Sequence, residues 1–218
     1  VLADGDVAAA ARTAADARLI NSGQSCIAAK RFIVIESLAD QFIERFREEL
    51  RSSRMGDPLA RETEIGPQAR ADLRDSLHQQ VEESVKRGAK RLLGGEIPAG
   101  KGAFYPPTLL DAVDKGMPAF DEETFGPVAA VIRAKDEADA VRLANDSPYG
   151  LGASVWTRDR ACAERVATQI EAGSVFVNSL VKSDPRLPFG GIKRSGYGRE
   201  LSEYGIREFV NIKSVWIA

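Results

Sequence analysis

Hydrophobic residues along this chain follow two different periods, which alternate from segment to segment. Over 38–50 they recur every three or four positions, which places them on one face of a helix that Ser37 is expected to cap. A similar period, or a high alanine content, predicts further helices, which cover residues 6–20, 67–87, 137–144, 159–170 and 200–204.

Between the helical segments lie short runs of β-branched and other apolar residues, which are typical of buried strands. They cover residues 30–35, 90–93, 108–110, 127–132, 153–156 and 174–178. The closing run 209–217 alternates enough to predict an exposed strand. Strands that alternate with helices in this way favour an α/β fold, with a three-layer, mainly parallel sheet flanked by helices.

The composition fits a globular domain and excludes some classes of binding partner. Among 218 residues, 30 are Lys or Arg and 32 are Asp or Glu, so the formal net charge is −2. This balance predicts no nucleic acid as a partner, and no apolar run approaches the ~18 residues of a membrane span. Two cysteines cannot form a disulfide framework, so a reducing compartment, most simply the cytoplasm, is expected.

Candidate chemistry starts at Cys26, which ends the polar segment 21–26 (NSGQSC) between the first predicted helix and the first predicted strand. A tight turn there would leave the thiol at a loop, where free backbone N–H groups can lower its pKa and make it a nucleophile. An isolated cysteine is more often structural, but five polar or glycine neighbours favour the nucleophile. Cys162, in a predicted helix, is expected to pack, and His78 has no partners spaced to bind a metal.

Two later segments also carry polar groups beside turns. In 122–127 (EETFGP) a carboxylate could accept hydrogen bonds from ribose hydroxyls and the ring could pack on a flat group, although an acidic turn is the simpler interpretation. The glycine-rich segment 188–198 lacks the full dinucleotide-binding fingerprint, so tight loop packing explains it better. The cations near it could receive an anionic substrate or be solvated; they are Lys182, Arg186, Lys193 and Arg194.

The motifs NSGQSC, EETFGPV and PFGGIKRSGYGRE, in this order and at these separations, resemble the aldehyde dehydrogenase superfamily over the whole chain. CIAAKRFIV, FYPPTLL and ANDSPYGL are most similar to NAD-preferring succinate-semialdehyde dehydrogenases. The resemblance implies an NAD(P)-dependent oxidoreductase that oxidises an aldehyde, most specifically succinate semialdehyde, to the carboxylic acid.

The resemblance also implies roles for single residues. Cys26 matches the nucleophile, which forms a thiohemiacetal and then, after hydride transfer to NAD or NADP, a thioester that water hydrolyses; its backbone N–H is half of the oxyanion hole. Glu123 matches the carboxylate that binds the nicotinamide ribose, with Phe125 as the ring beside it. Phe189 matches a wall of the aldehyde tunnel.

One position departs from the family pattern. Relatives that oxidise succinate semialdehyde often carry an arginine six residues before the nucleophile, where it grips the substrate carboxylate, but here that position is Ile20. Ser183 and Arg186 are therefore expected to bind the substrate, with Arg18 and Lys182 as further candidates.

By the resemblance, residues 1–205 form the aldehyde dehydrogenase catalytic domain and residues 206–218 form an arm whose strand pairs with another subunit of a homo-oligomer. The family's dinucleotide-binding domain, which holds most of the cofactor, the second oxyanion-hole group and the general base, is expected to be absent from these residues. The sequence also allows an alternative interpretation, in which this chain is not an enzyme by itself. Taken alone, the 218-residue chain would be a non-catalytic folding and assembly module with at most weak thiol esterase activity.

Overall fold

A four-stranded sheet forms the centre of the structure, a computed structural model that describes residues 1–218. Its strands, in spatial order, are β1 (Arg31–Ile35), β4 (Val128–Ala134), β3 (Thr108–Asp111) and β2 (Lys90–Leu93). Strands β1, β4 and β3 run parallel, and β2 is antiparallel to its neighbour β3. Strand β4 is almost wholly buried, as expected of a parallel strand that is covered on both faces.

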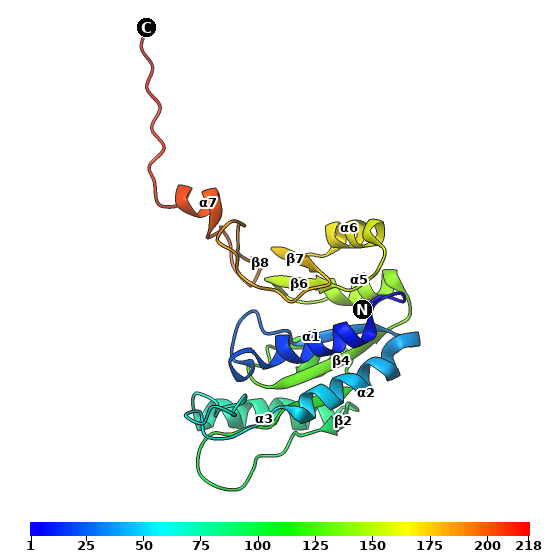
Figure 1. Cartoon of the computed structure of the whole chain (residues 1–218). Coiled ribbons are helices and arrows are strands. Elements are labelled where there is room, and N and C mark those ends of the chain that lie inside the picture. The colour runs from blue at the N-terminus through cyan, green and yellow to red at the C-terminus, as the bar shows by residue number, and fades with distance from the viewer.

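Helices cover both faces of this sheet (Figure 1), and alternate residues of β4 belong to two separate apolar clusters. One cluster includes side chains of α1 (Val7–Leu19) and α2 (Glu36–Ser52). The other includes side chains of α3 (Ala71–Lys86), α4 (Pro118–Asp121) and α5 (Glu137–Asn145). The predicted three-layer α/β arrangement is therefore confirmed.

The start of α2 corrects one expectation. Strand β1 pairs with β4 up to its last residue, Ile35, and α2 begins at the next residue, Glu36. Ser37 therefore lies inside the first turn of the helix, and no side chain caps this end. The prediction of a Ser37 cap was wrong because the strand leads into the helix without a connecting loop.

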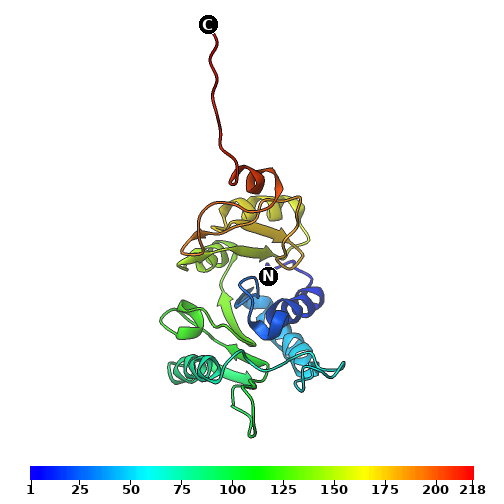
Figure 2. The same cartoon turned by 90° about the vertical axis from the view of Figure 1, so that its left-hand side faces the viewer.

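Two pairs of short strands lie beyond the edge of the main sheet. The parallel strands β6 (Gly152–Val155) and β7 (Ser174–Val177) are joined by α6 (Arg160–Gln169), and β5 (Tyr149–Gly150) pairs with β8 (Ile192–Lys193). The first residues of the chain connect these strands to the main sheet, with the N-terminus between the two (Figure 2). Ile35 donates its backbone N–H to Val1, and Leu2 donates to Trp156 just after β6. This link holds β1 and β6 on opposite sides of a cavity that both strands line.

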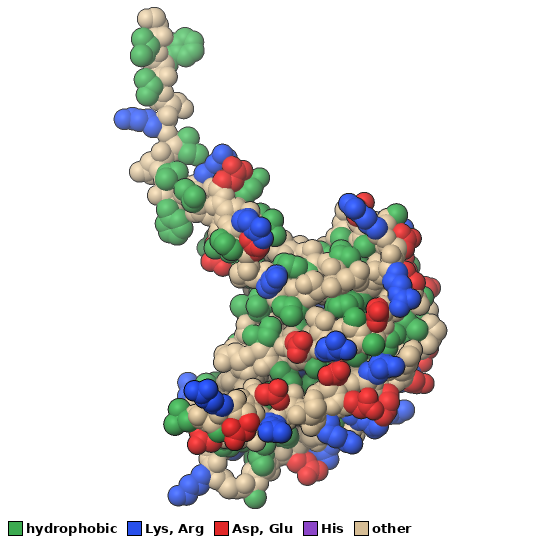
Figure 3. All heavy atoms as spheres, viewed as in Figure 1, with side chains coloured by type: hydrophobic (Ala, Val, Ile, Leu, Met, Phe, Trp, Pro, Cys, Tyr) green, Lys and Arg blue, Asp and Glu red, His purple; other side chains and the backbone are tan.

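The C-terminal residues leave the body of the molecule. After α7 (Ser202–Arg207), residues 211–218 extend outward without forming a strand (Figure 1). Their hydrophobic side chains stand clear of the rest of the chain (Figure 3), and Ile212 and Trp216 are 92% and 91% exposed. The strand predicted over 209–217 is not formed within the chain, because a strand needs a partner and none lies within reach. No helix of the structure has the length and apolar character needed to cross a membrane.

Candidate active site

The turn that precedes Cys26 has an unusual backbone. It follows α1 as a 3-10 turn, η1 (Ile20–Gly23), in which Asn21, Ser22 and Gly23 all have positive φ values of 50°, 55° and 76°. Two non-glycine residues in this region store backbone strain of the kind that is concentrated at functional sites. A Cβ atom at Gly23 would come within 2.2 Å of the backbone of Gly126, so the turn also depends on glycine for close packing. The turn leaves Cys26 exposed at a loop, as the sequence predicted.

Arg18 holds this turn from inside the protein. Its side chain is completely buried, and its guanidinium donates to the carbonyl oxygen of Gly23 at 2.8 Å and to that of Val128 at 3.3 Å. Burial lowers the pKa of Arg18, and the negative charge of Glu123 partly offsets this effect. Arg18 was a candidate for binding a substrate carboxylate, but its side chain is completely buried, its two terminal nitrogens donate to backbone carbonyls, and its Nε has no partner.

A loop between α2 and α3 holds the same turn from the other side. The backbone N–H of Gly66 donates to the Ser22 hydroxyl at 3.0 Å, and the buried side-chain amide of Gln68 donates to the Ser22 carbonyl at 3.4 Å. The backbone N–H of Ala69 donates to the side-chain oxygen of Gln24 at 2.8 Å. These partners are more than forty positions away in the chain. Such contacts leave no local pattern, so the sequence did not predict them.

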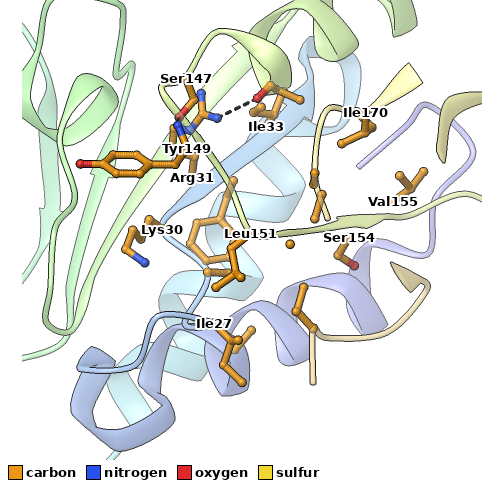
Figure 4. A pocket seen from close by; sticks show the side chains of 18 of the residues that line it. Ile27, Lys30, Arg31, Ile33, Ser147, Tyr149, Leu151, Ser154, Val155 and Ile170 are labelled. Carbon is orange, nitrogen blue, oxygen red and sulfur yellow. Dashed lines mark hydrogen bonds between the residues drawn. The ribbon is translucent and has the colours of Figure 1, made fainter. Parts of the chain in front are cut away.

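Cys26 lines a cavity of about 510 Å³ that occupies the gap between β1 and β6. The lining is mainly hydrophobic and comes from several elements, as the side chains of Ile27, Ile33 and Val155 show in Figure 4. The backbone N–H of Cys26 donates to no carbonyl of the chain. This N–H is therefore free to donate to an oxygen atom that carries negative charge beside the thiol.

Two carboxylates reach the same cavity from the segment after α4. Glu123 forms an ion pair with Lys30, with 3.2 Å between Oε1 and Nζ, and Glu122 accepts a hydrogen bond from the side chain of Gln80 at 2.8 Å. Both glutamates also line a second hollow of about 450 Å³ along α3, where the half-exposed ring of Phe125 lies. Glu123 thus stands where the cavity of the thiol meets a polar groove.

Among the other predicted residues, Arg194 also lines the cavity of Cys26. The three residues assigned to the substrate do not line it. Phe189 is half-buried and pairs through its backbone with Glu200. Ser183 is exposed, and the exposed Arg186 forms an ion pair with Asp184 at 2.6 Å, which lowers the pKa of that carboxyl. Because none of these three residues lines the cavity of Cys26, the structure gives them no place beside the thiol.

The glycine-rich segment is tightly packed at Gly190 and Gly191, as the sequence predicted, whereas a Cβ atom at Gly196 or Gly198 would meet nothing within 4 Å. A Cβ atom at Gly173 would come within 1.7 Å of the Gly190 carbonyl oxygen, so the two chain segments touch through their backbones. Lys193 from this segment donates to the carbonyl oxygens of Asn145 and Ser147 and forms an ion pair with Glu171. It therefore fastens the loop and is not free for a substrate.

The remaining candidates have structural surroundings. Cys162 is buried in α6, where its thiol donates to Glu137 at 3.2 Å and burial raises its pKa, which confirms the predicted packing role. The Nδ1 atom of His78 lies 3.2 Å from the hydroxyl of the buried Tyr105. The structure has no group of three or more His, Cys, Asp or Glu side chains that could hold a metal ion.

Comparison with known proteins gives a consistent family. The model described as "Aldehyde dehydrogenase family" matches residues 1–215. Over 216 residues the chain is 51% identical to the succinate semialdehyde dehydrogenase Sad of Escherichia coli (strain K12), named as NAD(P)+-dependent; the match covers 99% of this chain and 47% of that protein. It is 48% identical to the NADP(+) succinate-semialdehyde dehydrogenase 1 of Mycobacterium ulcerans (strain Agy99), with coverage of 100% and 47%.

A solved structure agrees with these relatives. The succinic semialdehyde dehydrogenase of Streptococcus pyogenes, in complex with NADP+, superposes with a TM-score of 0.95 at 38% identity. The superposition covers 99% of this chain and 48% of that one. The chain therefore spans about half the length of the proteins that it matches.

Proposed function

This chain belongs to the aldehyde dehydrogenase family, and from that premise we propose that Cys26 is the nucleophile of an NAD(P)-dependent oxidation of an aldehyde. The observation that carries the proposal is the position of the thiol. It is exposed at a strained turn that Arg18 and Gln68 hold from two sides, and it opens into a cavity that Glu123 also lines.

The surroundings of Cys26 suit covalent chemistry on a carbonyl group. The thiolate attacks the aldehyde carbon to form a thiohemiacetal, and the free backbone N–H of Cys26 donates to the oxygen that becomes negative. Loss of hydride from that carbon gives a thioester, and water then releases the carboxylic acid and restores the thiol. No residue of this chain is assigned as the base that activates the water.

The segment around Glu123 fits the nicotinamide ribose of NAD or NADP. One carboxylate oxygen of Glu123 is engaged by Lys30, which leaves the other to accept hydrogen bonds from ribose hydroxyls, and the half-exposed ring of Phe125 offers a flat apolar contact beside it. When bound, the nicotinamide accepts the hydride. The relatives are named for NAD(P)+ or NADP(+), and both cofactors are proposed here.

Succinate semialdehyde is the proposed substrate, because it is the substrate in the names of the relatives from Escherichia coli and Mycobacterium ulcerans. Its carboxylate needs a cationic or hydroxyl partner. Ser183 and Arg186 remain the proposed partners, although Arg186 must then exchange Asp184 for the substrate. Phe189 remains the proposed wall of the aldehyde tunnel. We also propose that the exposed apolar arm, residues 206–218, pairs with another subunit of a cytoplasmic homo-oligomer.

The test uses the natural protein, meaning the full-length protein in which these residues occur. NAD(P)H formation is followed with succinate semialdehyde and with butanal, which has the same chain length and no carboxylate. Cys26→Ala should lower turnover on the order of 10³-fold or more, as loss of a covalent nucleophile does, whereas Cys162→Ala should retain it. Full turnover by Cys26→Ala contradicts the proposal, and equal rates with the two aldehydes contradict the substrate.

The alternative role is tested on the 218-residue chain alone. If that chain is only a folding and assembly module, it forms no NAD(P)H from aldehyde, and any slow ester hydrolysis depends on Cys26. NAD(P)H formation by the chain alone excludes this alternative, and ester hydrolysis that persists in Cys26→Ala excludes the thiol esterase activity.

A further inference from the structure

Lys30 occupies the junction between the nucleophile turn and Glu123, although no sequence motif singled it out. It precedes β1, and its side chain is 19% exposed. The ammonium group has three acceptors within reach: the Glu123 carboxylate and the Ala28 carbonyl, both at 3.2 Å, and the Cys26 carbonyl at 3.4 Å. The two carbonyls accept hydrogen bonds from the ammonium, and the carboxylate forms an ion pair with it, so all three contacts suit a group with three N–H donors.

The surroundings make Lys30 and Glu123 depend on each other. Burial and the nearby charge of Arg18 lower the pKa of the Lys30 ammonium, and the Glu123 carboxylate opposes both effects. Arg18 itself is committed to the carbonyls of Gly23 and Val128. Lys30 is therefore the cation that holds the Glu123 carboxylate directly, and Glu123 is the anion that compensates a mostly buried ammonium.

The neighbouring glutamate provides a contrast within the same segment. The carboxylate of Glu122 is held by the neutral side-chain amide of Gln80 from α3, which also donates to the backbone carbonyl of Glu123 at 3.3 Å. Glu123 is held by a cation whose other two bonds go to the backbone of the nucleophile segment. One ammonium thus spans the gap between the carboxylate and the main chain of Cys26.

We propose that Lys30 is a positioning residue that fixes Glu123 to the backbone of the nucleophile turn, so that cofactor binding at Glu123 and the geometry of Cys26 are coupled through one ammonium group. The inference deepens the proposed function and rests on it, since it takes Glu123 as the ligand of the cofactor ribose. Lys30 fixes Oε1 of Glu123 and leaves the second oxygen for the ribose hydroxyls. When those hydroxyls bind, the carboxylate shares its charge between them and the ammonium, and the bonds from Lys30 to the Cys26 and Ala28 carbonyls change with it.

A double-mutant cycle in the natural protein tests this coupling. The four forms are wild type, Lys30→Met, Glu123→Gln and the double variant, and the measured quantities are the Kd of NADP+ and NAD+ and the rate of Cys26 alkylation by iodoacetamide with and without cofactor. We expect each single variant to raise the Kd by about 3- to 10-fold, and the double variant to bind no more weakly than Glu123→Gln alone, because residues in contact are not additive. The effect of cofactor on the alkylation rate should disappear in Lys30→Met.

Two further variants separate positioning from general damage. Lys30→Arg keeps the charge but cannot reproduce the same three contacts, so it should restore part of the cofactor affinity. Lys90→Met removes an exposed lysine from β2, at the far edge of the main sheet, and should change nothing. If Lys30→Met does not fold, Lys30→Gln takes its place in the cycle.

The outcomes distinguish this inference from the proposed function. If Glu123→Gln weakens cofactor binding while Lys30→Met does not, or if the two effects multiply in the double variant, the role of Lys30 is refuted and that of Glu123 remains. If Glu123→Gln leaves the Kd unchanged, the cofactor role of Glu123 is refuted and the coupling is refuted with it. A Lys30→Met variant in which cofactor still changes the alkylation rate as in wild type also refutes the coupling.

Discussion

The two cysteines of this chain have opposite surroundings. Cys26 is exposed, follows a turn with left-handed backbone, and lines a cavity that Glu123 shares. Cys162 is 9% exposed in the regular helix α6, where its thiol donates to Glu137 and lies 3.5 Å from a nitrogen of Arg165. The same side chain is thus presented to a ligand in one place and packed away in the other.

The difference lies in what each position requires from the rest of the fold. Cys162 needs only the helical period, which turns it toward the core beside Ala163 and Val166. Cys26 needs a strained turn that Arg18 links to Val128 and that Gln68 and Gly126 hold from distant parts of the chain. Exposure of a reactive group therefore depends on long-range contacts, whereas burial of an inert one depends on local sequence.

The largest expected effect is a difference in alkylation between the two thiols of the 218-residue chain. Burial shields the Cys162 thiol from reagents and raises its pKa. At neutral or mildly alkaline pH a smaller fraction of Cys162 is therefore present as the reactive thiolate. We expect iodoacetamide at about pH 8 to modify Cys26 on the order of 10²-fold faster. Peptide mass spectrometry measures both rates, and similar rates would remove the contrast.

A smaller effect is expected from glycine substitutions that share one backbone angle. Gly23 and Gly198 both have a φ of 76°, but a Cβ at Gly23 would meet Gly126 at 2.2 Å, while nothing lies within 4 Å of one at Gly198. Gly198→Ala should cost about 1 kcal/mol of unfolding free energy from backbone strain alone. Gly23→Ala should cost about 2–3 kcal/mol because overpacking is added. Denaturant unfolding measures both, and equal costs would mean that the turn tolerates a shift away from Gly126.

The smallest effect is expected at the buried cysteine. Glu137 accepts a hydrogen bond from the Cys162 thiol. Burial is the largest cause of the raised pKa of this thiol, and the hydrogen bond to Glu137 and the negative charge of Glu137 raise it further. Glu137→Gln removes the charge, so the pKa should fall and alkylation of Cys162 should become faster by about threefold or less, because the carboxylate is partly exposed to solvent. Aldehyde turnover of the natural protein should not change. Slower alkylation would mean that Glu137 assists the thiolate.

Much of the fold follows from local patterns in the sequence. Strand β4 and helix α2 lie close to their predicted positions. A strand that is buried on both faces shows a continuous apolar run, and a helix that is buried on one face shows apolar residues every three or four positions. The two-residue strands β5 and β8 and the short helix α4 were missed, since they are too short to show a period. The strand over 209–217 was predicted from alternation, which does not supply a partner.

The site was predicted less completely than the fold. The polar turn indicated Cys26, but nothing local distinguishes Arg18 as a core residue that bonds to Gly23 and Val128. The contact between Lys30 and Glu123 joins positions far apart in the chain, and its only sequence signal is a lysine at the start of an apolar strand. The roles of Arg18 and Lys30 become visible only in the folded structure, where their distant partners lie beside them.

The most direct test of Cys26 as the nucleophile follows activity during alkylation of the natural protein. Samples are withdrawn while iodoacetamide reacts, and each is assayed for NAD(P)H formation from succinate semialdehyde and for the modified fraction of the Cys26 and Cys162 peptides. If Cys26 is the nucleophile, activity falls in proportion to the modified fraction of Cys26 and reaches zero while Cys162 is still unmodified. Activity that persists once Cys26 is fully modified would show that the reaction does not pass through this thiol.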